Sequence, residues 1–180
     1  MELELKKVSV SHKSDMGFIE RIYIESFPPD ERRPVNEFRQ LIADDNEFSV
    51  YMLLNEEERM GFLTYWTFDT FIYAEHFAIV PEHRNGGIGK SVMEAFIAST
   101  KLPLILEVEM PDTEMAQRRI GFYKRVGFKL WDISYKQPPY QEAYEALPMM
   151  LMTYRDIDLD KDFEHIKRKI YKTVYNVSDI

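Results

Sequence analysis

The 180-residue sequence contains no cysteine. This absence excludes disulfide bonds, a cysteine nucleophile, and zinc or iron–sulfur sites built on thiolates. It also fits the reducing conditions of the cytoplasm, where disulfides rarely persist. We expect a cytoplasmic protein, and we expect no metal centre.

Long apolar runs and an excess of positive charge are missing as well. No apolar run in the sequence approaches the roughly 20 residues that a membrane-spanning helix needs. The first residues, Met1 to Lys7, alternate Glu and Leu and lack the basic start and apolar stretch of a secretory signal. Lys and Arg number 23 against 31 Asp and Glu, giving a net charge of -8, opposite in sign to a typical nucleic-acid binder. We expect a soluble protein with neither membrane nor nucleic-acid partners.

Apolar residues make up 45% of the chain, enough for a sizeable core in one domain. Period-two alternation and helical spacing of apolar residues predict the elements in turn. Strands are expected over residues 3–10, 47–54, 60–68, 71–80, 104–110, 128–135 and 148–155, and helices over 15–26, 34–42, 87–100, 113–126 and 158–171. This order predicts an α/β (α+β) fold around a central mixed sheet flanked by helices.

Glycine is scarce, but three of the seven glycines fall between residues 86 and 89. They follow the apolar strand that ends at Val80-Pro81 and open the next helix. Such a turn lets the backbone approach a ligand closely, and the unpaired N–H groups of the helix start attract an anion. The P-loop and Rossmann patterns both fail here, because Arg84 and Val92 stand where each requires a glycine.

A third pattern fits this turn completely. Arg84-Asn85-Gly86-Gly87-Ile88-Gly89 matches Gln/Arg-x-x-Gly-x-Gly/Ala and resembles the acetyl-CoA signature of the GNAT superfamily of N-acetyltransferases. The later segment Ile120 to Phe128 resembles the family's second signature, in which a helix carrying a tyrosine enters a Gly-Phe strand. The resemblance covers roughly Leu3 to Arg155 and is specific from Tyr73 to Phe128.

The resemblance implies a single GNAT-like domain over residues 1–180. Its core would cover about 3–155, with the mostly antiparallel sheet splayed between two parallel central strands at 71–80 and 104–110. Residues 156–180 would form an added C-terminal helical extension. An apolar stripe on this helix comprises Phe163, Ile166, Ile170 and Val174. The stripe suggests a homodimer interface, and the alternative is that it covers the core of the same chain.

The resemblance also implies how acetyl-CoA, as co-substrate, would bind. The pantetheine arm would hydrogen-bond the main chain of Phe77, Ala78 and Ile79. The pyrophosphate would lie on the N–H groups from Asn85 to Lys90, and Arg84 and Lys90 would add positive charge. The helix of the second signature departs from the family, because no Asn lies between Pro111 and Tyr123.

The chemistry implied by the resemblance is direct attack of an amine on the thioester, which needs a base for the protonated amine. Tyr123 stands where the family places the acid for the leaving thiolate, with a packing role as the alternative. Glu107 and Glu75 are both candidate bases, Glu107 being slightly favoured. Either could be a structural ion-pair partner, and water could relay the proton instead. His76 is expected to be a packed histidine.

The sequence therefore predicts an acetyl-CoA-dependent N-acetyltransferase that acts on a primary amine of a small molecule or peptide. The alternative is a non-catalytic acyl-CoA-binding or regulatory module on the same fold. By resemblance the acceptor would lie against residues 26–33 and 137–147. Phe27, Tyr140 and Tyr144 would give apolar walls there, and Asp30, Glu31 and Glu142 would attract a cation.

Overall fold

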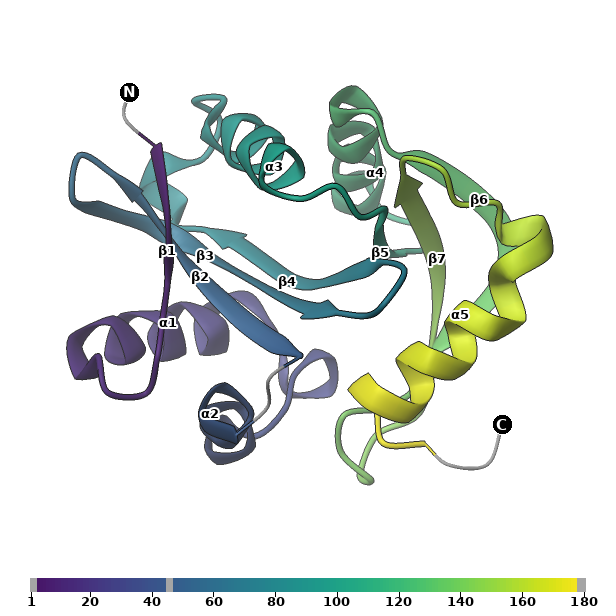
Figure 1. The fold of residues 1–180 in the computed structure, drawn as a ribbon, viewed down its shortest axis with the longest axis horizontal. Helices are drawn as coiled ribbons and strands as arrows, with labels where there is room; N and C mark the ends of the chain where they lie inside the picture. The colour runs from purple at the N-terminus through teal and green to yellow at the C-terminus, as the bar shows by residue number, and fades with distance from the viewer. Residues whose placement is uncertain (1–2, 45–46, 178–180) are drawn as a thin grey trace. The chain divides into compact units, whose positions relative to one another are not determined.

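The computed structural model describes residues 3–44 and 47–177. The chain divides into two compact units. The first comprises Met1–Asp69 and Ala74–Lys101, and the second comprises Thr70–Tyr73 and Leu102–Ile180. The chain path through both is drawn in Figure 1, and each unit is described by itself.

The first unit is built on the strand order β1-β2-β3-β4. These strands are β1 (Leu3–Lys7), β2 (Phe48–Asn55), β3 (Glu58–Thr67) and β4 (Ile72–Ile79), whose first two residues belong to the second unit. β1 and β2 pair antiparallel, as do β2 and β3, where Tyr51 lies opposite Leu63. β3 is buried along nearly its whole length, as expected of a strand covered on both faces.

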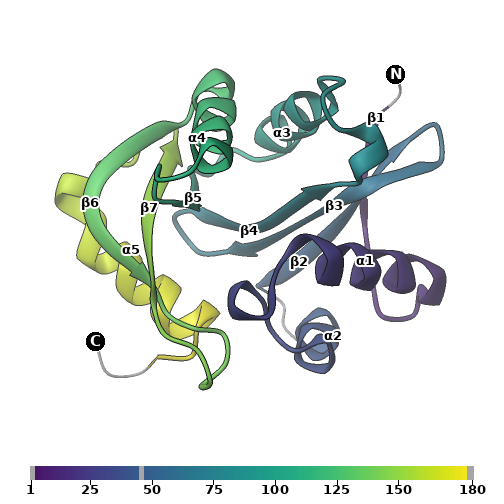
Figure 2. The same ribbon diagram turned by 180° about the vertical axis from the view of Figure 1, so that it is seen from behind.

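Helices cover both faces of this first sheet. α1 (Lys13–Ser26) and α2 (Val35–Asp44) lie on one face and α3 (Ile88–Ser99) on the other, as Figures 1 and 2 both show. Short 3-10 turns at Pro29–Glu31 and Pro81–His83 lead into the segments that carry candidate site residues. The face toward α1 and α2 is packed by stacked rings, with Tyr23 and Phe38 centroids 4.3 Å apart.

The second unit has the antiparallel strand order β5-β7-β6. These strands are β5 (Leu104–Glu109), β6 (Lys129–Gln137) and β7 (Leu147–Tyr154). α4 (Glu114–Val126) and the C-terminal helix α5 (Leu159–Val174) lie on opposite faces of this sheet (Figure 2). The sheet therefore presents one face to each helix.

Capping residues mark both ends of α4 and the start of α5, close to the ends predicted from the sequence. Thr113 Oγ1 accepts the N–H of Ala116 at 3.1 Å and caps α4, which ends at Gly127 in the left-handed region (φ 103°). Asp158 caps α5 in the same way. The expected α/β class and the order of the main helices and strands are confirmed.

The C-terminal helix differs from expectation in two respects. It continues to Val174, one turn beyond the predicted end at residue 171. Its stripe is buried against the second unit, since Ile166, Ile170 and Val174 are at most 5% exposed. These three residues of the stripe thus cover the core of their own chain, which was the alternative to a dimer interface, and the homodimer stays a prediction. Over the described residues, no helix is long and apolar enough to cross a membrane.

Candidate active site

The glycine turn forms an open cradle at the start of α3. Gly87 is the N-cap of this helix with φ 80°, and a Cβ built on Gly86 or Gly87 would meet no atom within 4 Å. Asn85 is also left-handed, with φ 66°. The positive φ at Gly87 favours glycine, and the empty space above it leaves room for a ligand to reach the backbone.

The helix start supplies donors for an anion. The first helical hydrogen bond runs from Ser91 N to Gly87 O at 3.1 Å, so the amides of residues 88–90 lie outside the helical ladder. No side chain caps the helix at Gly87. The aligned peptide dipoles add positive potential at this end. This arrangement fits a phosphate or pyrophosphate group.

The two cations of the turn contribute differently. Arg84 donates from Nε to the carbonyl oxygen of Ile79 at 2.8 Å, which anchors its guanidinium beside the turn. Lys90 lies 3.6 Å from Glu94 in an exposed pair, so part of its charge is already compensated. Arg84 is therefore fixed beside the turn, whereas Lys90 shares its charge with Glu94.

The main chain of β4 alternates its hydrogen-bonding direction along the strand. The amides of His76 and Val80 donate toward β3, to Thr64 Oγ1 at 3.0 Å and to the Met60 carbonyl at 2.9 Å. By alternation the N–H and C=O of Ala78 also face β3. The same groups of Phe77 and Ile79 face the other edge. Of the three residues expected to bind pantetheine, this geometry favours Phe77 and Ile79 over Ala78.

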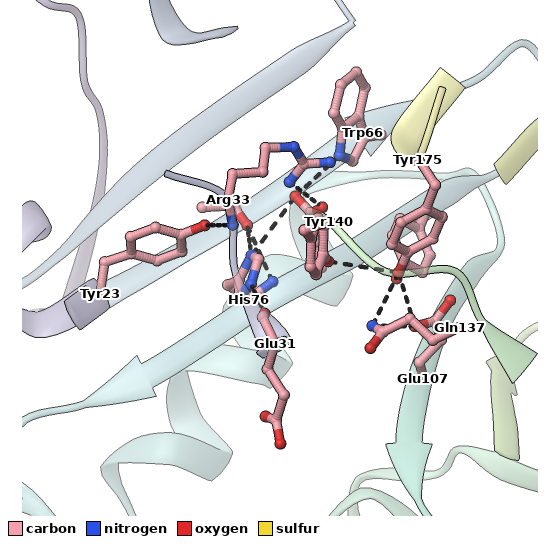
Figure 3. Close-up of polar contacts among 12 residues, drawn as sticks. Tyr23, Glu31, Arg33, Trp66, His76, Glu107, Gln137, Tyr140 and Tyr175 are labelled. Carbon is pink, nitrogen blue, oxygen red and sulfur yellow. Dashed lines mark hydrogen bonds and ion pairs between the residues drawn. The ribbon is translucent and has the colours of Figure 1, made fainter. Parts of the chain in front are cut away.

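Glu107, on β5, is held by a ring of neutral donors (Figure 3). Tyr135 donates its hydroxyl to Oε1, and Gln137 Nε2 donates to Oε2 at 2.7 Å. Tyr175 donates its hydroxyl to the same Oε2 at 2.9 Å. Burial raises the pKa of Glu107 to about 7, although these hydrogen bonds oppose the rise. A carboxyl group with a pKa near 7 can take up and release a proton at neutral pH.

Glu75, on β4, lies in a contrasting environment. Its Oε1 pairs with Arg33 Nη1 at 2.5 Å, and its Oε2 accepts the indole N–H of Trp66 at 3.0 Å. The side chains of Glu75 and Arg33 are 0% and 7% exposed. Burial alone would raise the pKa of Glu75, but the Arg33 charge and the hydrogen bonds of His76 and Arg33 outweigh it and lower the pKa to about 2. The structural ion-pair alternative thus accounts for Glu75.

His76 is a packed histidine, as expected. It is 3% exposed, and its Nε2 lies 3.1 Å from the Glu31 carbonyl oxygen. Its ring meets Tyr23 and Phe27 edge-on, with centroids 5.1 and 4.6 Å away. It joins the loop before α2 to β4.

Tyr123 lies on α4, with only 8% of its surface exposed. Its ring packs against Phe122 and Phe128 at centroid distances of 5.0 and 5.6 Å. Burial raises its pKa to about 12, so the phenol keeps its proton at neutral pH. A packing role and a role as proton donor are both compatible with this position.

Sequence reasoning missed the partners of both glutamates. Arg33 is 42 positions from Glu75, and Tyr175 is 68 positions from Glu107. Two signals could have found the Glu107 partners. Period-two alternation carried past residue 135 puts Gln137 on the same face as Tyr135, and helical spacing from Tyr171 leads to Tyr175.

No group of three or more His, Cys, Asp or Glu in the described ranges could hold a metal ion. The site chemistry described above rests on carboxyl, phenol, guanidinium and backbone groups.

Comparisons with known proteins agree with this geometry. The family model of the acetyltransferase (GNAT) domain matches residues 46–130. A solved structure assigned to the GNAT acetyltransferases, from Bacteroides thetaiotaomicron, is 41% identical, with TM-score 0.94, covering 99% of this chain and 100% of that one. YjbC of Bacillus subtilis, named as an acetyltransferase, is 25% identical over 158 residues, 77% of this chain and 80% of that protein.

More distant structures share the fold. Arabidopsis thaliana NAA60, solved with a bisubstrate analogue, is 18% identical with TM-score 0.62, covering 85% of this chain and 97% of that one. The same plant enzyme has also been solved with acetyl-CoA. With the 41% identical relative matched over nearly its whole length, the chain belongs to the GNAT family of acetyltransferases, which transfer an acetyl group from acetyl-CoA.

Proposed function

We propose that this acetyltransferase moves the acetyl group to a primary amine of a small molecule or peptide by direct attack, with Glu107 as the base. The observation that carries the proposal is the burial of the Glu107 carboxyl among the neutral donors Tyr135, Gln137 and Tyr175, which raises its pKa to about 7 and suits proton exchange at neutral pH. The absence of cysteine supports a cytoplasmic location.

The residues of the α3 cradle fit acetyl-CoA, which supplies a thioester activated toward attack. The amides of residues 88–90 and the Arg84 guanidinium would hold the pyrophosphate, and Gly86 and Gly87 keep the space above them open. The main chain of Phe77 and Ile79 would bind the pantetheine arm.

The base is assigned by the difference between the two glutamates. An alkyl ammonium must lose a proton before nitrogen can attack a carbonyl carbon. Glu75 holds a proton poorly, because its pKa is about 2 and Arg33 and Trp66 bind its two oxygens. Glu107 has no such charge compensation from its neutral donors and accepts a proton far more readily.

Tyr123 is proposed as the acid for the leaving thiolate. Its raised pKa keeps the phenol protonated, and its ring is fixed on α4 by Phe122 and Phe128. The proton would pass from its hydroxyl to the sulfur as the carbon–sulfur bond breaks.

The acceptor segments carry the expected mixture of apolar and acidic groups. Glu142 is exposed, and Tyr144 is 37% exposed on the loop before β7. The loop after α1 is fixed by Arg32, whose Nε donates to the Phe27 carbonyl at 2.9 Å. Of these features, the exposed Glu142 carboxylate supports a cationic amine as acceptor.

The decisive experiment follows thiol release from acetyl-CoA across a panel of primary amines. Glu107→Gln should lower turnover at neutral pH by at least about 100-fold and regain part of the rate as pH approaches the pKa of the amine. Glu109→Gln, at a half-buried residue that pairs with Arg119 two positions along the same strand, is the matched control and should turn over normally. Normal turnover by Glu107→Gln would refute the base assignment.

A parallel binding measurement separates the enzyme from the non-catalytic alternative. At 100 times its dissociation constant, acetyl-CoA should add about 2.7 kcal/mol to the free energy of unfolding of parent and Glu107→Gln alike. Binding without turnover across the whole panel would favour the acyl-CoA-binding module.

A further inference from the structure

Tyr175 ends the C-terminal helix and brings its hydroxyl to the candidate base. The residue is the C-cap of α5 and is 8% exposed. The helix before it is fixed in the second unit by Ile166, Ile170 and Val174, which are all buried. The position of the Tyr175 hydroxyl is therefore set by a packed helix rather than by a loop.

Three groups at this point form a closed triangle of hydrogen bonds (Figure 3). Tyr175 donates to Glu107 Oε2 at 2.9 Å. Gln137 Nε2 donates to the same Oε2 at 2.7 Å and to the Tyr175 oxygen at 2.9 Å. Because a phenol has a single proton, the Tyr175 hydroxyl that donates to Glu107 must accept from Gln137.

A second phenol, Tyr73, belongs to the same network. Its oxygen lies 3.0 Å from the Tyr175 oxygen, and it also acts on Glu107 as a hydrogen-bond donor that lowers the pKa of this carboxyl. A hydroxyl that accepts hydrogen bonds becomes a stronger donor, because the bonds along a chain polarise one another. The network thus directs the Tyr175 proton at the carboxylate.

We propose that Tyr175 is a positioning residue of this enzyme: its hydroxyl fixes the Glu107 carboxylate and stabilises its charged form. The inference rests on the proposed role of Glu107 as base. It adds that the C-terminal helix, which lies outside the resemblance seen in the sequence, lowers the pKa of that base through the Tyr175 hydroxyl.

The charge state of Glu107 depends on neutral donors from several elements. The groups that donate hydrogen bonds to it come from β4, β6 and the end of α5, and they are Tyr73, Tyr135, Gln137 and Tyr175. Two more phenols face this network: Tyr140 lies 3.5 Å from the Tyr175 hydroxyl, and Tyr171 interacts with Glu107 through charge and not through a hydrogen bond. Removing a donor from a carboxylate leaves the charged form less stable and raises its pKa. Loss of the Tyr175 hydroxyl should act in this direction.

The variant that tests the proposal is Tyr175→Phe, and Tyr171→Phe is its matched control. The Tyr171 hydroxyl lies one helical turn earlier and donates to the Lys136 carbonyl, so its loss leaves every hydrogen bond to Glu107 in place. Phenylalanine at 175 keeps the ring that packs 5.0 Å from Tyr140. Both variants remove one buried or half-buried hydroxyl from the same helix.

Two readouts are taken on each variant. The first is the acidic limb of the pH profile of kcat/KM, which should move to higher pH by about one unit in Tyr175→Phe and stay unchanged in Tyr171→Phe. The second is a carbon-13 NMR titration of glutamate side-chain carboxyls, with the Glu107 signal assigned by its disappearance in Glu107→Gln. It should show the same rise in the pKa of Glu107.

The outcomes separate the two hypotheses. An unchanged Glu107 titration in Tyr175→Phe refutes the positioning role. A shifted titration with an unshifted pH profile supports the positioning role and shows instead that Glu107 is not the base. Should Tyr175→Phe fail to fold, Tyr175→Met also removes the hydroxyl that donates to Glu107, and an unshifted titration there counts equally against the proposal.

Discussion

Replacing Glu75 by glutamine should destabilise the protein strongly, because it removes the negative charge that faces the buried Arg33 guanidinium. The Arg33 and Glu75 side chains are 7% and 0% exposed and lie 2.5 Å apart. Glutamine keeps the size of the side chain and can still accept the indole N–H of Trp66. The change therefore removes one charge with little change in packing.

Two independent arguments give the same magnitude. Breaking a buried ion pair by removing one partner costs about 3–5 kcal/mol. The pKa of Glu75 falls from its usual 4.5 to about 2 on folding. At about 1.4 kcal/mol per unit, this difference corresponds to about 3 kcal/mol of stability at neutral pH. We expect Glu75→Gln to lower the free energy of unfolding by about 3 kcal/mol.

Urea unfolding over a range of pH is the assay. A depressed pKa contributes stability above the unfolded value near 4.5, and that contribution is lost as pH falls toward 2. The parent should lose it over this window, whereas the Glu75→Gln variant should lack it at every pH. Glu58→Gln, at a 62% exposed residue paired with His83, is the control and should change stability by less than about 1 kcal/mol.

A Glu75→Gln protein within about 1 kcal/mol of the parent, with the same acid sensitivity, would refute the role of this pair. The variant also bears on catalysis. Where it remains folded, it should retain the parent's turnover, since the base is assigned to Glu107.

Three further predictions concern the cradle, the acid and the sheet. Gly87→Glu should bind acetyl-CoA at least about tenfold more weakly than Gly87→Ala, because both variants share the backbone strain at φ 80° and only the first adds a negative charge. Equal affinities of the two variants in calorimetry would mean that the pyrophosphate does not bind at this turn. Tyr123→Phe should lower turnover at least about tenfold with unchanged acetyl-CoA affinity, and normal turnover would leave Tyr123 a packing residue. Gly61→Ala should lower the free energy of unfolding by about 2–3 kcal/mol, because the Cβ of the new alanine would lie 2.0 Å from the Ala78 carbonyl oxygen. An unchanged midpoint of urea unfolding would contradict this close approach.

The order of elements could be predicted from the sequence because its signals are local. Alternation over residues 60–68 identifies β3 within two residues of its observed start and one of its end. The caps Thr113 and Gly127 of α4 act within a few residues of the helix they bound. The extra turn of α5 was missed because its last buried positions depend on packing against the rest of the second unit.

The candidate site also has one part that could be predicted from the sequence and one part that could not. The cradle at Gly87 could be predicted, because a glycine turn between a strand and a helix is a property of neighbouring residues. The environment of each glutamate could not be predicted, because Arg33 and Tyr175 reach Glu75 and Glu107 only through the tertiary fold. A residue list therefore gives the candidates for a base but not their ionisation.

The opposite ionisation of the two glutamates follows from the charge of their partners. Burial raises the pKa of both, since a charge in a low-dielectric interior loses its hydration. Arg33 offers Glu75 a full positive charge, whereas Tyr135, Gln137 and Tyr175 offer Glu107 only dipoles. A carboxylate stabilised by a cation has little tendency to accept a proton, so Glu75 serves the fold. A carboxylate stabilised by dipoles alone retains that tendency near neutral pH, and its pKa changes with each donor, which is the physical basis of the role proposed for the phenol at the end of α5.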